Sequence, residues 1–283
     1  MSNRGVEDDE QDLTRKQRRE QARAQRKAVE EEQAASAKRR ARLTQLGIAA
    51  VVVIAAVVVI LIATGGGGSS KNEAKSGTKV ANENVTTVSN LIGGIPQTGT
   101  TLGDPNAPVT LKYFGDLECP ICRDFTLGAF PEIVQKWVRT GKVKVEYHSM
   151  ETATREPEVF NTQQIAALAA GKQNLGWYYI ELFYHEQGEE DSGYVTESYL
   201  QNLAQQVPGL DLSKWTADRS NPELANQIEA DKQTVNNEGF TGTPSFLIGK
   251  TGGHMEKITE LSTADLQEAS ALFDPKIEAL LKS

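Results

Sequence analysis

Cys119-Pro120-Ile121-Cys122 contains the only two cysteines in the 283-residue chain, separated by two residues. Residues 109–114, just before the pair, are rich in β-branched and aromatic side chains, which favours a strand. After the pair, apolar residues recur at helical spacing over residues 130–138. The two cysteines are therefore predicted to lie where a strand ends and a helix begins.

A helix start activates a cysteine. Its free N–H groups and its dipole stabilise the thiolate, which is the reactive form, and lower the pKa from about 8.5. Cys119 holds the first and more exposed position, so it is the candidate nucleophile. Cys122, one turn further in, is the candidate resolving thiol, and Pro120 opens the predicted helix.

Two other uses of a cysteine pair fit the sequence less well. A tetrahedral zinc site needs four ligands, but there is no second cysteine pair, and His148, His185 and His254 are widely separated. A structural disulfide closing so short a loop would remove little entropy from the unfolded chain. Redox chemistry by Cys119 and Cys122, without a metal or a cofactor, is the favoured interpretation.

Residues 1–45 differ in composition from the rest of the chain. They carry 12 Lys and Arg against 9 Asp and Glu, whereas the remainder carries 18 against 29. The segment has too few apolar residues for a core, which predicts a solvated arm. The acidic remainder does not suggest binding to nucleic acid.

The run from Leu46 to Ala63 has no charged residue and is long enough to cross a lipid bilayer as a helix. The alternative is a cleaved signal peptide, which has a short basic start and an exit of the Ala-x-Ala kind. A long arm precedes this run, and Leu61-Ile62-Ala63 lacks the first small residue. We therefore expect an uncleaved transmembrane helix at residues 46–64.

Basic residues set the expected orientation of this anchor. They crowd the stretch from Lys38 to Arg42 and are sparser after the apolar run. The positive-inside rule then puts the N-terminus in the cytoplasm and the body outside it. We expect a single-pass protein of the cell membrane with an extracytoplasmic body, tethered by a flexible glycine-rich linker at residues 65–84.

Residues 85–156 are expected to form the first part of the folded body. A short edge strand or turn is predicted near its start, within residues 84–96. The strand before the cysteines and a second strand at 142–148 flank the helix, which predicts a βαβ unit with parallel strands. Pro131 should kink that helix.

Residues 157–238 show the apolar spacing of four helices. In residues 239–283, a strand at 244–248 and an antiparallel partner at 254–258 precede a helix capped by Ser262 or Thr263. A last helix is expected to start at Asp274-Pro275.

Three stretches resemble the DsbA-like thiol-disulfide oxidoreductases, which have a thioredoxin fold. They are residues 103–111, which enter the first strand, residues 114–122 around the cysteines, and residues 239–246, Gly-Phe-Thr-Gly-Thr-Pro-Ser-Phe. The likeness is closest to membrane-anchored members of Gram-positive, especially actinobacterial, type. It implies an α/β chain: a thioredoxin-like fold with an inserted helical domain, preceded by the transmembrane helix.

The resemblance implies a cis peptide bond between Thr243 and Pro244. The backbone of Thr243 would then face the active site and bind an extended substrate segment by strand addition. The alternative is an ordinary trans proline that opens a strand.

The chain departs from the family at two positions near the cysteines. Many relatives carry an acidic residue six positions before the first cysteine, where this chain has Tyr113. Asp116 and Glu118 are candidates to replace that acidic residue as proton acceptor. The alternative is that both carboxylates are simply exposed to solvent. Ile121 stands where some relatives have a histidine that hydrogen-bonds near the thiolate.

These observations predict an extracytoplasmic oxidase that donates the Cys119–Cys122 disulfide to secreted or membrane client proteins. The family implies reoxidation by a quinone-linked membrane enzyme of the DsbB or vitamin K epoxide reductase type. Two alternatives stay open: a reductase or isomerase on the same fold, and a tethered binding or chaperone module without turnover.

Overall fold

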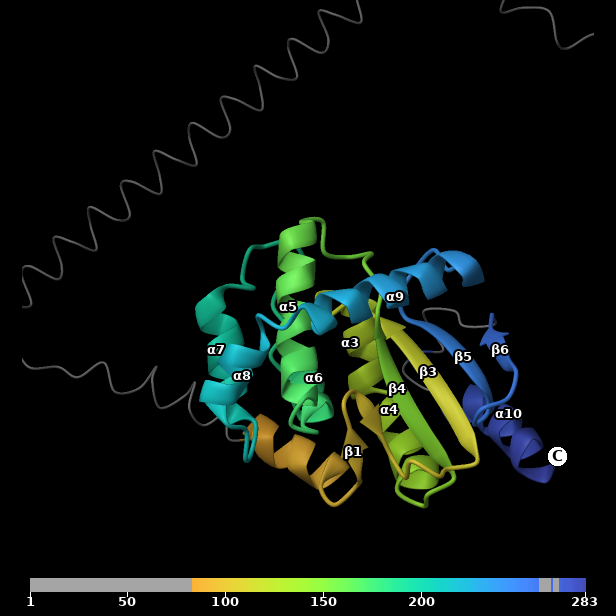
Figure 1. The fold of residues 1–283 in the computed structure, drawn as a ribbon. Coiled ribbons are helices and arrows are strands. Elements are labelled where there is room, and N and C mark those ends of the chain that lie inside the picture. Colours follow the sequence, from red (N-terminus) through yellow and green to blue (C-terminus); the bar gives the residue numbers. More distant parts are fainter. Residues whose placement is uncertain (1–82, 260–265, 267–269) are drawn as a thin grey trace, which may run out of the picture. The chain divides into compact units, whose positions relative to one another are not determined.

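The computed structural model describes residues 83–259, 266 and 270–283 (Figure 1). Several predictions lie outside these residues: the charged arm, the anchor at 46–64, nearly all of the linker, and helix capping by Ser262 or Thr263. Among the residues that the structure describes, no helix combines the length and the apolar character needed to cross a membrane.

A six-stranded sheet in the order β1-β2-β4-β3-β5-β6 is the frame of the fold. The central strands β3 and β4 are parallel, and β5 runs antiparallel to β3. The strands predicted on both sides of the cysteines and near the C-terminus are confirmed. The strands are β1 (Gln97–Thr98), β2 (Thr101–Leu102), β3 (Val109–Gly115), β4 (Val143–Ser149), β5 (Ser245–Lys250) and β6 (Met255–Ile258).

The predicted βαβ unit is formed by β3, three short helical segments and β4. These segments are α3 (Pro120–Leu127), α4 (Phe130–Ile133) and the wider π-helical turn η1 (Val134–Val138). The chain needs such a crossover because parallel strands cannot be joined by a tight hairpin. The crossover carries the cysteine pair at its start.

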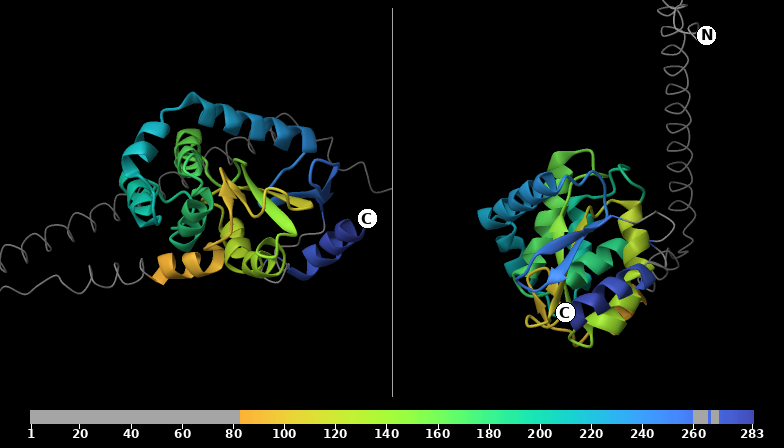
Figure 2. Two further views of the ribbon diagram at one scale, coloured as in Figure 1. Left: turned by 60° about the horizontal axis from the view of Figure 1, so that its bottom comes forward. Right: turned by 90° about the vertical axis from the view of Figure 1, so that its right-hand side faces the viewer.

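A helical block is inserted between β4 and β5, and its last helix leads back to the sheet (Figure 2). The four predicted helices are present. A fifth, the seven-residue α8, is not among the predictions because its only buried side chain is Trp215. The helices are α5 (Pro157–Gly171), α6 (Gly176–His185), α7 (Glu197–Gln206), α8 (Leu212–Asp218) and α9 (Pro222–Glu238).

The prediction of an edge strand or turn within residues 84–96 was wrong for residues 84–92, because residues 83–92 form a helix; a turn follows at Gly93 and Gly94. Val85, Val88 and Ile92 are spaced by three and four residues, which is helical periodicity. Val88 and Ile92 are fully buried. The short strands β1 and β2 follow this helix.

Two predictions about proline were also wrong. Pro131 does not kink a continuous helix: α3 ends at Leu127, and Pro131 lies in the first turn of α4, where a missing N–H costs no hydrogen bond. Helix α10 (Ser270–Lys282) begins before Asp274-Pro275, so Pro275 lies inside it. Burial of Phe273 and Ile277, four residues apart, favours the longer helix.

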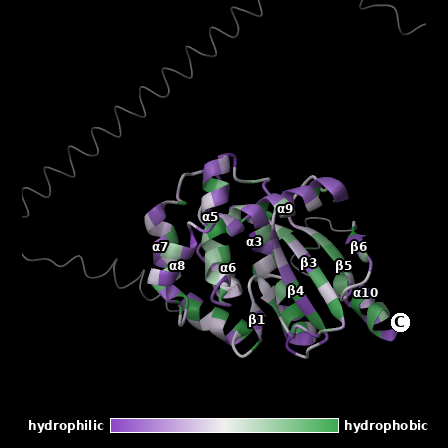
Figure 3. Ribbon diagram, viewed as in Figure 1, coloured by the Kyte–Doolittle hydropathy of each residue, from purple (hydrophilic) through white to green (hydrophobic). Residues whose placement is uncertain are grey.

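Successive side chains of a strand point to opposite faces of the sheet, so the sheet separates two apolar layers. Tyr113 and Tyr147 belong to the large core under α3, while Phe114 lies in a smaller apolar cluster on the opposite face. His148 points to that second face and contacts α9. In Figure 3, α9 is mostly hydrophilic, consistent with a helix that covers the sheet with one narrow side.

Candidate functional site

The cysteine pair lies at the N-terminus of α3, as predicted. Cys119 is the N-cap residue, and Pro120 occupies the first turn. The Sγ atom of Cys119 accepts a hydrogen bond from the backbone N–H of Cys122 at 3.4 Å. The backbone N–H of Cys119 donates to the carbonyl of Asp116 at 3.1 Å, and this hydrogen bond closes the turn between β3 and α3. Both thiols are free.

The two thiols differ in exposure and in pKa. Cys119 is 5% exposed and Cys122 is fully buried. The hydrogen bond with the Cys122 thiol lowers the pKa of Cys119 to about 7. Burial opposes this shift, whereas hydrogen bonds with Thr243 and with the N–H groups of Cys122 and Ile121 lower the pKa further. Burial, followed by the neighbouring Cys119, raises the pKa of Cys122 well above its usual range. Near neutral pH, Cys119 is therefore the more easily ionised of the two thiols.

The loop before β5 meets the cysteines from the far end of the sequence. The Thr243–Pro244 peptide bond is cis, which confirms that prediction. The Cys119 thiol donates to the carbonyl oxygen of Thr243 across 3.6 Å. Thr243 and Pro244 are both partly exposed. A polypeptide that reaches Cys119 would therefore also meet the backbone of Thr243.

Tyr113 is buried below the cysteines, at the position where the resemblance implied an acidic residue in many relatives. Its hydroxyl lies 3.4 Å from the carbonyl oxygen of Cys122, 3.3 Å from the Thr126 hydroxyl and 3.2 Å from the Tyr184 hydroxyl. Burial raises the pKa of Tyr113 well above its usual range, and the charges of Cys122 and Tyr147 add to this. The phenol stays neutral near pH 7 and cannot serve as a base for Cys122.

Asp116 is fully buried, so simple solvent exposure is excluded for it. One carboxylate oxygen accepts hydrogen bonds from the backbone N–H groups of Thr152, Ala153 and Thr154 at 2.9–3.0 Å. The other accepts from the Thr154 hydroxyl at 2.7 Å and from the N–H of Glu118 at 3.1 Å. Asp116 therefore fixes the loop after β4 against the cysteine turn, which is a positioning task.

Glu118 is buried as well, with 2% of its surface exposed. Burial raises the pKa of its carboxyl; a hydrogen bond with Thr154 opposes this shift, and the charges of Asp116 and Asp191 add to it. The residue directly precedes Cys119. It is therefore the titratable carboxyl nearest in sequence to the nucleophile, and its role as proton acceptor stays a prediction.

Gln187 is a site residue that the sequence analysis missed. It follows α6, and its side-chain amide donates to the carbonyl oxygens of Leu117 at 2.7 Å and Cys119 at 3.1 Å. The helical block thereby holds the backbone of the cysteine turn. A glutamine in an irregular segment gives no sequence signal for such a contact. The side chain of Ile121, by contrast, packs against the core and has no donor for a hydrogen bond to the sulfur.

Comparison with known proteins gives a consistent result. The family model described as Thioredoxin matches residues 96–267. A probable disulfide bond formation protein D of Bacillus anthracis is 22% identical over 152 residues, 53% of this chain and 70% of the relative. Disulfide bond formation protein D of Bacillus subtilis (strain 168) is 26% identical over 154 residues, 52% of this chain and 66% of the relative.

Among solved structures, oxidised BdbD from Bacillus subtilis superposes with a TM-score of 0.55 at 23% identity, covering 68% of this chain and 99% of that chain. This likeness shows a shared fold. With the curated relatives, it confirms the resemblance to disulfide-forming proteins with a thioredoxin fold that the sequence suggested.

Proposed function

The chain belongs to the thioredoxin family, and we propose that it is a protein thiol oxidase that donates the Cys119–Cys122 disulfide to client proteins outside the cytoplasm. One observation carries the proposal: a cysteine with a pKa of about 7 lies beside the partly exposed Thr243 and above a fully buried second thiol. The names of the Bacillus relatives support the same chemistry.

The oxidase reaction proceeds by two exchanges. A client thiolate attacks Sγ of Cys119 in the oxidised protein, the Cys119–Cys122 bond breaks, and Cys122 leaves and takes up a proton. A second client thiolate then attacks the client sulfur of this mixed disulfide, and Cys119 leaves as a thiolate. The client loses two electrons and two protons, and the cysteine pair gains the electrons.

Stabilisation of the reduced form favours this direction, because it makes a dithiol–disulfide couple more oxidising. The hydrogen bonds that lower the pKa of Cys119 supply such stabilisation. Their effect is moderate, since Ile121 contributes no side-chain donor. We therefore expect a couple that is more oxidising than thioredoxin without reaching the most oxidising members of the family.

The backbone of Thr243 would hold the client during exchange. An extended client segment beside it pairs its own backbone by strand addition, which places the client cysteine next to Cys119. The sequence of the client matters little to such backbone contacts, which suits an enzyme that oxidises many proteins.

Localisation and partners belong to the same proposal. The uncharged run from Leu46 to Ala63 anchors the protein in the cell membrane, with residues 1–45 in the cytoplasm and the cysteines outside. Disulfides persist in that compartment. Turnover then needs a quinone-linked membrane enzyme of the DsbB or vitamin K epoxide reductase type to reoxidise Cys119 and Cys122.

The test is oxidation of a reduced, unfolded client with two cysteines by the oxidised protein. Wild type should form the client disulfide, and Cys119→Ser should form none. Cys122→Ser has no disulfide to donate, so it is mixed in its thiol form with the oxidised client. Its Cys119 thiolate should attack the client disulfide, release one client thiolate and accumulate a mixed disulfide, because no Cys122 is present to resolve it. Failure to oxidise the client, combined with rapid reshuffling of a scrambled client, would favour an isomerase. Binding of the client by all three proteins without any exchange would favour a chaperone module.

A further inference from the structure

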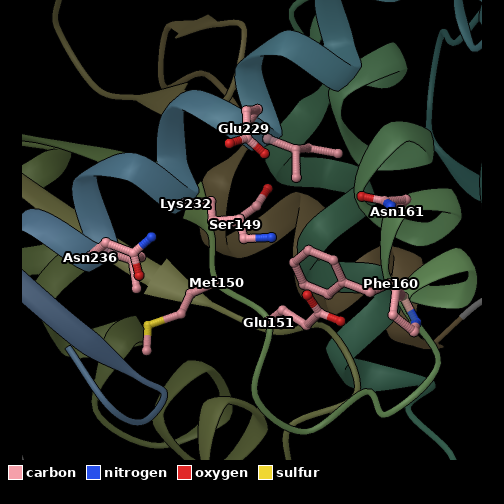
Figure 4. A pocket seen from close by; sticks show the side chains of 11 residues that line it. Ser149, Met150, Glu151, Phe160, Asn161, Glu229, Lys232 and Asn236 are labelled. Carbon is pink, nitrogen blue, oxygen red and sulfur yellow. The ribbon is translucent and has the colours of Figure 1, made fainter. Parts of the chain in front are cut away.

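A hollow opens between α5, α9 and the chain that leaves β4 (Figure 4). Its volume is about 250 Å³. The lining includes the buried apolar side chains of Met150, Phe160 and Ile228. Exposed polar side chains surround this floor, with Asn236 and Asn161 on opposite sides of the hollow in Figure 4. An apolar floor within a polar rim is typical of a pocket that accepts an apolar group.

The hollow is linked to the cysteine site by a short series of contacts. Its lining includes Glu151, and the next residue, Thr152, has its hydroxyl 2.5 Å from that of Thr243. The carbonyl of Thr243 in turn lies 3.6 Å from Sγ of Cys119. Asp116 fixes the same stretch by accepting the N–H of Thr152 at 3.0 Å. A client segment that lies along Thr243 and extends past Thr152 would therefore lead towards the hollow.

The size of the hollow suits one large side chain. Cavities of about 150 Å³ lined by apolar side chains bind benzene, whereas pockets for whole small molecules start at about 300 Å³. The hollow, at about 250 Å³, falls between these values. The rim carries the carboxylates of Glu151 and Glu229 against one cation, Lys232, so an acidic occupant is disfavoured.

We propose that this hollow is a docking pocket for an aromatic or large aliphatic side chain of the client polypeptide, on the segment that carries the reacting cysteine. The inference rests on the proposed oxidase function and adds a selectivity to it. Backbone pairing at Thr243 accepts any sequence, whereas the pocket favours clients with an apolar residue at a set distance from the cysteine.

The expected spacing follows from the contacts between Cys119 and Glu151. The path through Thr243 and Thr152 is on the order of 10–15 Å, since neighbouring Cα atoms are about 3.8 Å apart. An extended client advances about 3.3 Å per residue, so the apolar residue should lie roughly three to five positions from the cysteine. Such residues are abundant in unfolded clients and buried in folded ones.

The test compares short peptides that carry one cysteine and either phenylalanine or alanine three, four or five positions away, on either side. The rate of mixed-disulfide formation with the oxidised full-length protein is measured as a second-order rate constant. Burying a phenylalanine side chain contributes about 1.5–3 kcal/mol, so the best phenylalanine peptide should react roughly 10–100 times faster than its alanine partner.

Two variants close the hollow from opposite walls without touching its floor: Asn236→Trp on α9 and Asn161→Trp on α5. Both positions are exposed, which limits the effect on folding. Each variant should reduce the ratio of the phenylalanine rate to the alanine rate towards one. Gln233→Trp is the matched control, because Gln233 is an exposed residue of α9 outside the lining and should leave the ratio unchanged.

A phenylalanine peptide with serine in place of cysteine should slow the reaction of the cysteine peptide by competition in wild type, and not in Asn236→Trp. Equal rates for the phenylalanine and alanine peptides would contradict the proposed docking pocket. A ratio of the phenylalanine rate to the alanine rate that both tryptophan variants leave unchanged would contradict it as well. The alanine peptide alone reports on the oxidase function: if it reacts while the ratio is one, only the pocket has failed.

Discussion

At the scale of single residues, the two cysteines have opposite chemical states. Cys119 has a pKa of about 7, and burial keeps Cys122 a thiol well above neutral pH. Iodoacetamide should therefore modify Cys119 alone in the reduced protein, with a rate that rises with pH to a half-maximum near pH 7. Mass spectrometry of the modified peptide identifies the site. Modification of Cys122 first would reverse the assigned roles.

A second residue-scale prediction concerns Glu181 on α6. Its side chain is fully buried, and neither carboxylate oxygen has a hydrogen-bond partner among the described residues. Burial raises its pKa from 4.5 to about 8. The folded protein thus binds this proton more tightly than the unfolded chain, so folding stability falls as pH rises from about 4.5 to about 8, by on the order of 4 kcal/mol.

Glu181→Gln removes this titration while keeping the shape of the side chain. Denaturant unfolding at pH 5 and at pH 8.5 measures the free energy of unfolding of both proteins. The difference between variant and wild type should shift in favour of the variant at the higher pH. Other groups titrate in both proteins and cancel in the difference. A difference that is the same at both pH values would show that Glu181 does not carry a raised pKa.

Residue-scale sequence reasoning correctly placed the cysteines at a helix start, and the resemblance correctly implied the cis bond between Thr243 and Pro244. Sequence reasoning did not find Asp116 as a loop anchor, since its partners Thr152 to Thr154 are 36 to 38 residues away. Gln187 was missed for the same reason. Contacts between distant loops have no periodicity that a single sequence can display.

At the scale of elements, α9 is attached to the sheet by an ion pair. His148 on β4 lies 2.7 Å from Asp231 on α9, whose second oxygen accepts the N–H of Ser149 at 2.8 Å. Burial alone would lower the pKa of His148, but the hydrogen bonds with Asp231 and Glu146 outweigh it and raise the pKa above 6.5. The charged pair therefore stabilises the fold fully below about pH 6.5 and ceases to do so as pH rises through the raised pKa.

Asp231→Asn should lower the pKa of His148, which NMR titration of the imidazole ring measures directly. His185 serves as an internal control, because its pKa is lowered chiefly by burial and then by Arg123, away from this pair. A His148 titration curve that is the same in variant and wild type would contradict the role of the pair.

Strands were easier to predict than helix ends. The β3 and β4 patterns of β-branched residues fixed both strands to within a residue. The helix at 83–92 had a sequence signal in the helical spacing of Val85, Val88 and Ile92, although the segment is short. The early start of α10 had none, and depended on burial of Phe273. Tertiary packing of this kind overrides local signals such as Pro275.

At the scale of the whole molecule, the order of elements was predictable, because a βαβ unit, a helical block and a strand pair succeed one another along the chain. The hollow beside α9 was not predictable. It is lined by residues from three segments, 149–151, 157–161 and 228–236, which come together only in the fold.

The membrane anchor is a prediction for the 283-residue chain. The uncharged run from Leu46 to Ala63 should make it partition with membranes until detergent is added. Protease added to intact spheroplasts should digest the body and spare residues 1–45, whereas permeabilised spheroplasts should lose both. Protection of the body in intact spheroplasts would mean the reverse orientation.

The stability of the two redox states should differ in a defined direction. The interactions that favour the Cys119 thiolate also favour the folded dithiol form. The disulfide form should therefore unfold at a lower temperature than the dithiol form.

The reduction potential of the Cys119–Cys122 couple tests the oxidase proposal most directly. Equilibration with glutathione buffers, followed by trapping of free thiols, measures it. The lowered pKa of Cys119 and the absence of a side-chain donor at Ile121 predict a value between that of thioredoxin, about −270 mV, and that of the most oxidising relatives, about −120 mV. A value at or below about −270 mV would contradict an oxidase and identify the protein as a reductase.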